Sequence, residues 1–409
     1  MNHRCIVLTS CLAILILLAT MGLSCGKGEE EEKATVTIGL ISDLTGPAAP
    51  ALIPISYALY DVVDYYNTEE LIPGVEIKTA TYDAKYDPSR DIPGWEWVRG
   101  KGAKLIYTPL PTTGESLKVF AQRDEVPIFC GTGTIPQLEP PAWNFCLSPN
   151  IGTILESFLG WLSEEDWDYS EGIPKIGSTG WQEPYALEIN DAIRAYVQDH
   201  PGKFEYVAGL VAPMGTLTWS GEVERLKQCD YVVPPSTGLG TASFIQQFRN
   251  RGFTAKFIGA VAQLSFRGLV VDSVGYAAVD GMLCTCEQGW WTDSYPIMNL
   301  AKQLLYDNHP GEADDIVYSG AGYVVTIPLA FCVMEILKEA IDQVGVDNLD
   351  GQAIYDAAKT FRTTFEGYEE WNFTATKRYI QNHLGVYEWS AQQQDVVRAF
   401  ADWVPFEAE

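Results

Sequence analysis

The fold is decided by residues 36–47, which read VTIGLISDLTGP. The first six of these residues form a mostly apolar strand, and the last six form a loop that contains one Gly and one Pro. Residues 53–66 follow, with apolar side chains at helical spacing. A strand, a polar loop and a helix in this order make the first half of a βαβ unit, so the chain opens as an α/β protein.

Units of the same kind continue along the chain in two series. In the first series, Thr112 and Glu115 have capping-box spacing, which predicts a helix between the strands at 104–107 and 126–130. The second series begins near residue 150 and alternates strands at 174–178, 204–210, 231–233 and 256–259 with helices at 152–162, 184–197, 221–227 and 242–251. Repeated βαβ units form parallel sheets with helices on both faces. We therefore predict an α/β fold of two Rossmann-like lobes, each with a parallel central sheet.

The two series are not separated by a Gly/Ser-rich or Pro-rich linker. We therefore expect the lobes to be joined by strands that act as a three-strand hinge, with crossings near residues 146–150, 285–288 and 365–368. The predicted boundaries are 1–24 for a signal peptide, 25–34 for an acidic tether, 35–148 with 287–365 for lobe 1, and 149–286 with 366–409 for lobe 2.

The N-terminus has the features of an export signal. Residues 6–18 are almost wholly apolar, and this run is shorter than the roughly 20 residues of a membrane span. The small and apolar residues before Cys25 resemble a bacterial lipobox, although Gly22 stands where Leu is usual. The resemblance implies cleavage before Cys25, acylation of its thiol and a lipid anchor in the membrane. The alternative is plain secretion with Cys25 as a chance residue.

The charge excludes several classes of partner. The chain has 27 Lys and Arg against 54 Asp and Glu, a net charge of −27. Removal of residues 1–24, which hold one Arg and no acid, leaves 26 basic and 54 acidic residues, or −28. A protein this acidic does not bind nucleic acid as its main partner, because phosphate binding needs a basic surface. The four Glu residues at 29–32 suit a self-repelling spacer that holds a domain off the membrane.

The cysteines and histidines do not suggest a metal site or a cofactor. Six cysteines remain after the signal and Cys25, and no CxxC pair occurs among them, while the four histidines are scattered. An exported chain can form disulfides, and Cys130 and Cys146, which flank one loop, are the best candidate pair. Cys284 and Cys286 are two apart in a strand, so they point to opposite faces.

Several segments together resemble one known family. They are residues 37–47, IPGVEI at 72–77 with Asp83 and Asp87-Pro88, VPIF at 126–129 leading to TIPQL at 134–138, and FIQQFRNRGF at 244–253 with FIG at 257–259. In this order they resemble the substrate-binding proteins of branched-chain amino acid type ABC transporters over essentially the whole mature chain. The resemblance implies a type I periplasmic binding protein with two lobes, which close by a hinge around a ligand and deliver it to a permease.

The first lobe offers two candidate ligand loops. Ligands of open α/β sheets bind beyond the carboxyl ends of the strands. The loops at that place supply hydroxyls, free backbone N–H groups and a helix N-terminus, which suit a carboxylate or another acceptor-rich group. The candidate residues are Thr112, Thr113, Gly131, Thr132, Gly133 and Thr134. By resemblance to the family, Thr113, Thr132 and Thr134 hold the carboxylate; the alternative is that these threonines only cap helices and fill turns.

The second lobe departs from the amino-acid-binding pattern. The candidate residues are Trp181, Glu183, Ser236, Thr237 and Val261. Val261 stands where amino-acid-binding relatives have an acid that holds the ammonium of the ligand. A buried ammonium without a counter-charge is costly. Either Glu183 takes this role or the ligand has no α-ammonium, and we favour the second alternative.

The function we expect is that of a receptor without catalysis. The patterns GxSxG and HExxH and the phosphate-binding P-loop do not occur in the sequence. We predict a monomeric, lipid-anchored receptor on the extracytoplasmic face of a bacterial membrane. It would capture a small organic ligand (an amino acid, an amide or a carboxylate-bearing molecule) for an ABC permease. The alternative is a ligand-sensing co-receptor with the same fold.

Overall fold

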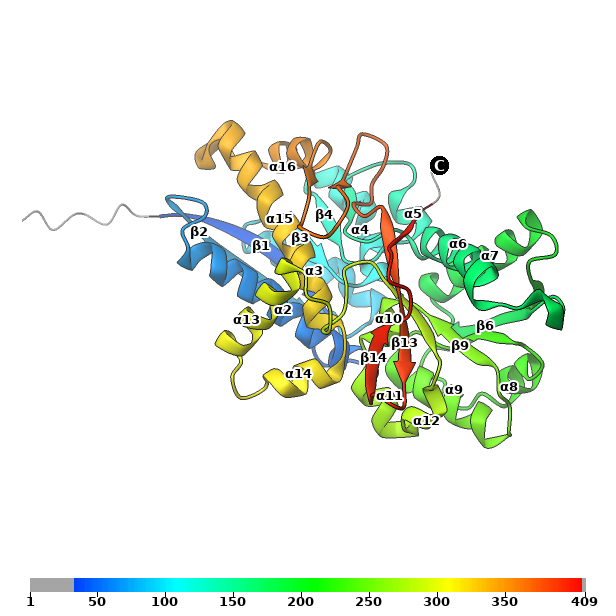
Figure 1. Cartoon of the computed structure of the whole chain (residues 1–409). Coiled ribbons are helices and arrows are strands. Elements are labelled where there is room, and N and C mark those ends of the chain that lie inside the picture. The colour runs from blue at the N-terminus through cyan, green and yellow to red at the C-terminus, as the bar shows by residue number, and fades with distance from the viewer. Residues whose placement is uncertain (1–32, 407–409) are drawn as a thin grey trace, which may run out of the picture.

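The computed structural model describes residues 33–406 (Figure 1). The predicted signal peptide, Cys25 and nearly all of the tether lie outside this range. Among residues 33–406, no single helix is long and apolar enough to span a membrane. The helices α14 (Ala313–Ser319) and α15 (Gly322–Val344) pass that test only together, across a bend of 95°.

The first lobe is built on a parallel sheet whose strand order is β2-β1-β3-β4-β5. The strands are β1 (Ala34–Ser42), β2 (Val75–Asp83), β3 (Ala103–Thr108), β4 (Ile128–Cys130) and β5 (Asn144–Cys146). Helices α2 (Ala49–Thr68), α3 (Asp91–Gly100), α4 (Pro111–Asp124) and α5 (Ile135–Leu138) connect them. All residues of β4 and β5 are buried, as is typical of strands covered on both faces.

The chain later returns to the first lobe. Helices α13 (Pro296–Asn308), α14 (Ala313–Ser319), α15 (Gly322–Val344) and α16 (Gly351–Ala358) follow one another there. Most of helix α15 is buried, and the helix packs against α2, α13 and α16 (Figure 1). Lobe 1 is therefore assembled from two separate stretches of chain.

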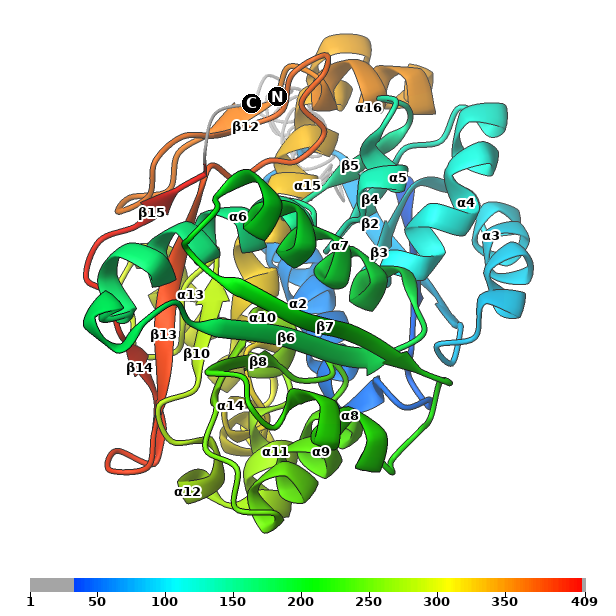
Figure 2. The same ribbon diagram turned by 90° about the vertical axis from the view of Figure 1, so that its right-hand side faces the viewer.

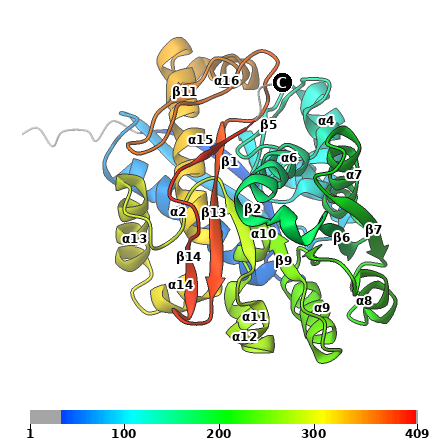
Figure 3. The ribbon, with the colours of Figure 1, turned by 45° about the vertical axis from the view of Figure 1, so that its right-hand side comes forward.

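The second lobe has a sheet of strand order β14-β13-β10-β9-β8-β6-β7. Strands β6 (Lys175–Trp181), β7 (Glu205–Ala212), β8 (Tyr231–Val233), β9 (Lys256–Gly259) and β10 (Leu283–Cys286) are parallel. Strands β13 (His383–Ser390), β14 (Asp395–Arg398) and β15 (Val404–Pro405) are antiparallel additions, and Figure 3 shows β13 and β14 side by side. The C-terminal strands β13 and β14 thus belong to the second sheet.

Helices cover both faces of the second sheet. Figure 2 shows α6 (Ile151–Trp161) and α7 (Pro184–Asp199) on one side of β6 and β7, with α8 (Ser220–Leu226) and α9 (Gly238–Asn250) on the other. The short helices α10 (Val261–Leu264), α11 (Arg267–Val274) and α12 (Tyr276–Val279) complete the lobe. Apart from the antiparallel edge, this is the doubly wound arrangement that the sequence predicts.

Three segments pass between the lobes, and the side-chain amide of Gln288 forms hydrogen bonds that connect them. They follow β5, follow β10 and precede β13. The side-chain amide of Gln288 donates to Ser148 Oγ at 2.8 Å and to Gln381 Oε1 at 3.3 Å. One residue from each crossing therefore takes part in a buried polar contact.

The third crossing is not where the sequence predicted it. The expected position was residues 365–368, with lobe 2 starting at 366. Instead, β11 (Arg362–Thr363) pairs with β12 (Trp371–Asn372). The Cys146 N–H then donates to the Arg378 carbonyl at 2.7 Å, and the Ile380 N–H donates to the Cys146 carbonyl at 3.1 Å. The segment up to Ile380 thus extends the edge of the first sheet beside β5, and the crossing follows it.

Candidate ligand-binding site

A cavity of about 120 Å³ lies where the two lobes meet. One water molecule needs about 10–15 Å³ by this measure, so the space equals roughly ten water molecules or a small organic molecule. Its apolar wall includes Ala51, Leu52, Ile55, Leu110 and Leu329 from lobe 1 and Phe266 from lobe 2. Its polar groups include Thr132 from lobe 1, Ser236 and Thr237 from lobe 2, and Ser148 and Gln288 from two crossings.

Helix N-termini surround the cavity because it lies beyond the carboxyl ends of the strands. Helix α4 follows β3, α7 follows β6 and α9 follows β8. The residues before or at these helix starts (Leu110, Glu183 and Thr237) line the cavity, and none of them caps its helix with a side-chain hydrogen bond. The first turns therefore keep amide groups for a ligand, and their partial positive charge favours an acceptor-rich group.

Glu183 is a buried carboxylate in the cavity wall. The residue is 3% exposed. The Tyr86 hydroxyl donates to Glu183 Oε2 at 2.6 Å, and the Ser236 hydroxyl donates to Oε1 at 3.2 Å. Burial raises the pKa of Glu183, while the two hydroxyl groups act in the opposite direction. Within residues 33–406, no Lys, Arg or His forms an ion pair with it, so the wall presents an acceptor without a protein counter-charge.

Two further buried carboxyl groups, those of Glu188 and Glu287, act electrostatically on Tyr185, which also lines the cavity. Glu188 accepts from the backbone N–H groups of Ile135 and Gly152, each at 3.0 Å. Neither carboxyl oxygen of Glu287 has a hydrogen-bond partner among the described residues. Burial raises the pKa of each group to about 7. The pKa of Tyr185 is raised mainly by burial and further by the charges of Glu287, Glu183 and Glu188. This side of the cavity is therefore acidic.

The structure brings together six of the residues proposed from the sequence. The cavity is lined by Gly131, Thr132, Glu183, Ser236, Thr237 and Val261. They come from loops after β4, β6, β8 and β9, on both sides of the cleft. The rule that ligands bind beyond strand ends therefore selects loops that line the cavity.

The other five proposed residues do not line the cavity, and four have a partner or neighbour elsewhere. The Thr113 hydroxyl donates to Asp91 Oδ1 at 2.8 Å, and the Thr134 hydroxyl donates to Glu115 Oε2 at 3.1 Å. The Trp181 ring N–H donates to the Thr216 carbonyl at 2.9 Å. Gly133 packs against Cys146, where an added Cβ would lie 2.2 Å from the sulfur. Thr112, in the first turn of α4, also lies outside the wall, so the structure does not bring these five residues to the cavity.

Sequence reasoning proposed none of the aromatic residues that line the cavity. Tyr86, Tyr107, Tyr185 and Phe266 line the cavity, as do Ser148 and Gln288 at the crossings. Tyr86 follows β2 and Tyr185 begins α7, so the strand-end rule covers both positions. Nothing in the local pattern shows which side of the loop faces the cleft.

Cys130 and Cys146 are direct partners in the pairing of β4 with β5. Both are buried thiols in this structure, like the other four cysteines among residues 33–406. The predicted disulfide therefore has adjacent partners and remains a prediction.

Comparisons with known proteins agree with this geometry. The sequence model of a family described as periplasmic binding protein matches residues 35–394. Among solved structures, a branched chain amino acid ABC transporter protein from Thermus thermophilus with bound valine is 17% identical. It has a TM-score of 0.77, and the alignment covers 92% of this chain and 97% of that chain. A search of curated proteins found no match.

Two other similar structures have different ligand descriptions. A fatty acid ABC transporter substrate-binding protein from Thermomonospora curvata has a TM-score of 0.78 at 15% identity, covering 92% of this chain and 93% of that one. A solute binding protein from Rhodopseudomonas palustris in complex with p-hydroxybenzoic acid has a TM-score of 0.74 at 14% identity, covering 91% and 98%. The predicted two-lobed α/β fold is confirmed, and the family is one of binding proteins and not of enzymes. The family match covers most of the sequence, and the chain therefore belongs to the periplasmic binding protein family.

Proposed function

We propose that this protein is the extracytoplasmic solute receptor of an ABC transporter, which captures a small organic molecule between its lobes and delivers it to the permease. The observation that carries the proposal is the cavity of about 120 Å³, to which both lobes and two crossings contribute. A ligand held by both lobes binds the closed arrangement better than the open one, so binding drives closure.

The lining supports a ligand with three chemical parts. An apolar body fits the aliphatic wall, and a carboxylate or amide oxygen fits Thr132 and the helix N-termini. An amine or another strong donor fits Glu183, which forms no ion pair within residues 33–406. The sequence favoured a ligand without an α-ammonium, but the position of Glu183 supports the other alternative. We therefore propose an amino acid or amino amide with a compact apolar side chain.

A thermal-shift screen with four matched compounds tests this assignment. Leucine carries the amine, the carboxylate and the apolar body, while 4-methylpentanoate lacks the amine, isopentylamine lacks the carboxylate and leucinamide replaces the carboxylate with an amide. A ligand at a thousandfold excess over its Kd stabilises the protein by about 4 kcal/mol. We expect shifts with leucine or leucinamide and smaller ones with the truncated compounds.

The outcomes separate the ligand class from the receptor role. A shift with 4-methylpentanoate equal to that with leucine would remove the role of Glu183 as amine acceptor and leave the receptor role intact. The absence of any hit in a wider set of amino acids, amides, aromatic acids and fatty acids would contradict the receptor role itself.

We further propose that the protein is a monomer held at the membrane by a lipid on Cys25. The acidic segment at 29–32 supports a spacer between that anchor and β1. In a cell expressing the Cys25→Ser variant, the protein should leave the membrane fraction, whereas Cys332→Ser should not release it. Light scattering of the purified protein should give the mass of one chain.

A further inference from the structure

The bond between Tyr86 and Glu183 joins the two lobes across the cavity. Tyr86 lies in the loop after β2 of lobe 1, and Glu183 lies at the start of α7 in lobe 2. The phenol oxygen lies 2.6 Å from Glu183 Oε2, and both residues line the cavity. A hydrogen bond to a carboxylate is stronger than one between neutral groups. This contact therefore connects the two lobes at the candidate ligand site itself.

The backbone that presents Tyr86 is in an unusual conformation. Lys85 and Tyr86 have φ angles of 57° and 54°, in the left-handed region that side chains with a Cβ rarely adopt. Such a conformation persists only where the surrounding structure holds it, and it is often found at ligand clamps. Two successive residues in this region turn the chain sharply and direct the Tyr86 ring into the cleft.

Asp83 and Gly46 hold this turn in place. Asp83 Oδ1 accepts from the backbone N–H of Leu44 at 2.9 Å and of Lys85 at 3.1 Å. The Arg90 guanidinium donates to the Asp83 carbonyl at 3.0 and 3.1 Å. Gly46 lies so close that an added Cβ would be 2.5 Å from the Lys85 carbonyl oxygen. The loops after β1 and β2 therefore support each other and fix Tyr86.

We infer that Tyr86 is a latch: its hydroxyl holds the lobes closed by binding Glu183, and it orients that carboxylate toward the ligand. This inference rests on the proposed receptor function. Hinge opening separates lobe 1 from lobe 2 and breaks the bond, so the latch adds to the stability of the closed state alone. A closed state that is more stable relative to the open one slows ligand release, whereas the rate of capture depends on the open state.

The Tyr86→Phe variant tests the latch because it removes the hydroxyl and keeps the ring. The matched control is Tyr60→Phe, which removes the hydrogen bond of Tyr60 to Thr81 Oγ1 (2.7 Å) inside lobe 1. With leucine as the probe, we expect Tyr86→Phe to raise the dissociation rate by roughly tenfold and to change the association rate less than twofold. Tyr60→Phe should change neither rate.

Small-angle scattering of the ligand-free protein gives a second readout that needs no ligand. Tyr86→Phe should increase the radius of gyration because the open arrangement becomes more populated, and Tyr60→Phe should leave it unchanged. Unchanged scattering together with an unchanged dissociation rate would overturn the latch. If leucine does not bind, the scattering alone decides the question, so failure of the latch and failure of the proposed ligand are distinguishable.

Discussion

At the scale of single residues, Thr113 and Thr132 show that similar side chains in two ligand loops have different roles. Thr113 donates to Asp91, a buried carboxyl group whose pKa is raised by burial. Thr132 lines the cavity. Sequence spacing identifies both loops, but the direction of each hydroxyl depends on packing against neighbours such as Asp91. Residue patterns alone do not determine that packing.

The Thr113→Ala variant should therefore affect mainly stability, and the Thr132→Ala variant should affect mainly ligand affinity. Loss of the Thr113 hydroxyl leaves Asp91 with one donor fewer, which should lower the free energy of unfolding by about 1–3 kcal/mol and leave the Kd within twofold. Thr132→Ala should weaken ligand binding and change stability by less than about 0.5 kcal/mol. Urea unfolding and titration calorimetry measure the two quantities. A loss of affinity in Thr113→Ala would return that residue to the site.

Glu287 should make stability depend on pH. Burial raises its pKa from 4.5 to about 7, so the folded protein binds this proton more tightly than the unfolded chain does. Its contribution is fully present below pH 4.5 and is lost as the pH rises through 7. The loss is on the order of 3 kcal/mol, because one pKa unit corresponds to about 1.4 kcal/mol.

The Glu287→Gln variant isolates this effect because its amide does not titrate. The stability difference between the variant and the original protein should be small at pH 5 and should grow in favour of the variant by pH 8. Both proteins contain the other titrating groups, including Glu188, so the effects of those groups cancel in the difference between the two pH curves. Parallel pH curves for the two proteins in urea unfolding would contradict the assignment.

At the scale of elements, the order of strands and helices follows from short apolar runs and polar loops. Assigning strands from short apolar runs predicted β1, β3 and β4 because each is a buried run that ends in a loop. It did not work for residues 378–380, which extend the edge of the first sheet through backbone hydrogen bonds to Cys146. Backbone pairing of an irregular segment depends on its position in space, and no side-chain period marks it.

The pairing of β4 with β5 also supports a disulfide between Cys130 and Cys146. Neighbouring strands lie about 4.8 Å apart, within the usual Cα separation for a disulfide. We expect protein exported to an oxidising compartment and purified without reductant to show two fewer titratable thiols in denaturant than the reduced protein. Removing the bond should cost about 3 kcal/mol for a loop of this length. Cys332→Ala, in the buried helix α15, is the control that should preserve the bond. Titration of every thiol would contradict the prediction.

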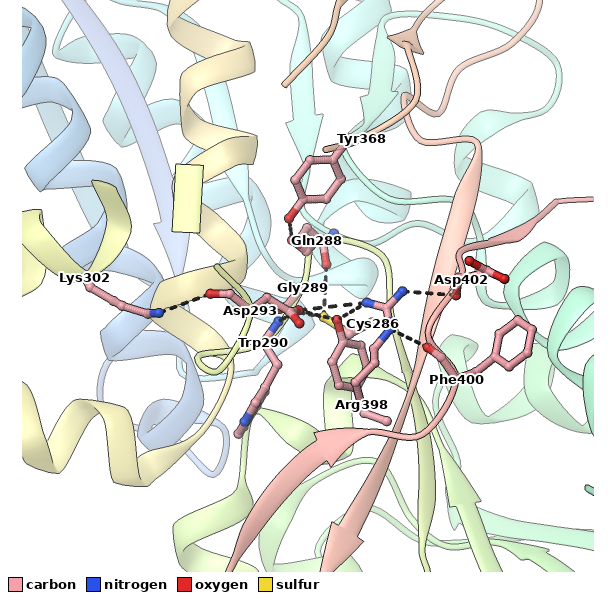
Figure 4. A network of polar contacts seen from close by, with 11 residues as sticks. Cys286, Gln288, Gly289, Trp290, Asp293, Lys302, Tyr368, Arg398, Phe400 and Asp402 are labelled. Atoms are coloured by element: carbon pink, nitrogen blue, oxygen red, sulfur yellow. Dashed lines mark hydrogen bonds and ion pairs between the residues drawn. The ribbon is translucent and has the colours of Figure 1, made fainter. Parts of the chain in front are cut away.

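At the scale of the whole molecule, polar contacts of Tyr387 and Arg398 connect the C-terminal strands of lobe 2 to Asp293, in the segment after β10 (Figure 4). Asp293 Oδ2 accepts from the Tyr387 hydroxyl at 2.6 Å and from the Trp290 N–H at 2.8 Å. Arg398 lies 3.9 Å from the same oxygen and donates to Tyr387 at 2.6 Å. Arg398 also donates to the carbonyls of Phe400 and Asp402. The family match ends at residue 394, so Asp293 and Tyr387 lie within the matched range, whereas Arg398, Phe400 and Asp402 lie after it.

The Asp293 and Arg398 pair should therefore control the stiffness of the hinge. Their side chains are only 12% and 16% exposed, so removing one partner leaves a largely buried charge. Asp293→Asn or Arg398→Met should each lower the free energy of unfolding by about 3 kcal/mol. The double variant should lose less than the sum of the two, because it leaves no unpaired charge. A double-mutant cycle in urea measures this coupling, and small-angle scattering of each variant should show a wider spread of lobe separations. Additive losses with unchanged scattering would mean that the C-terminal strands merely cover lobe 2 and do not restrain the hinge.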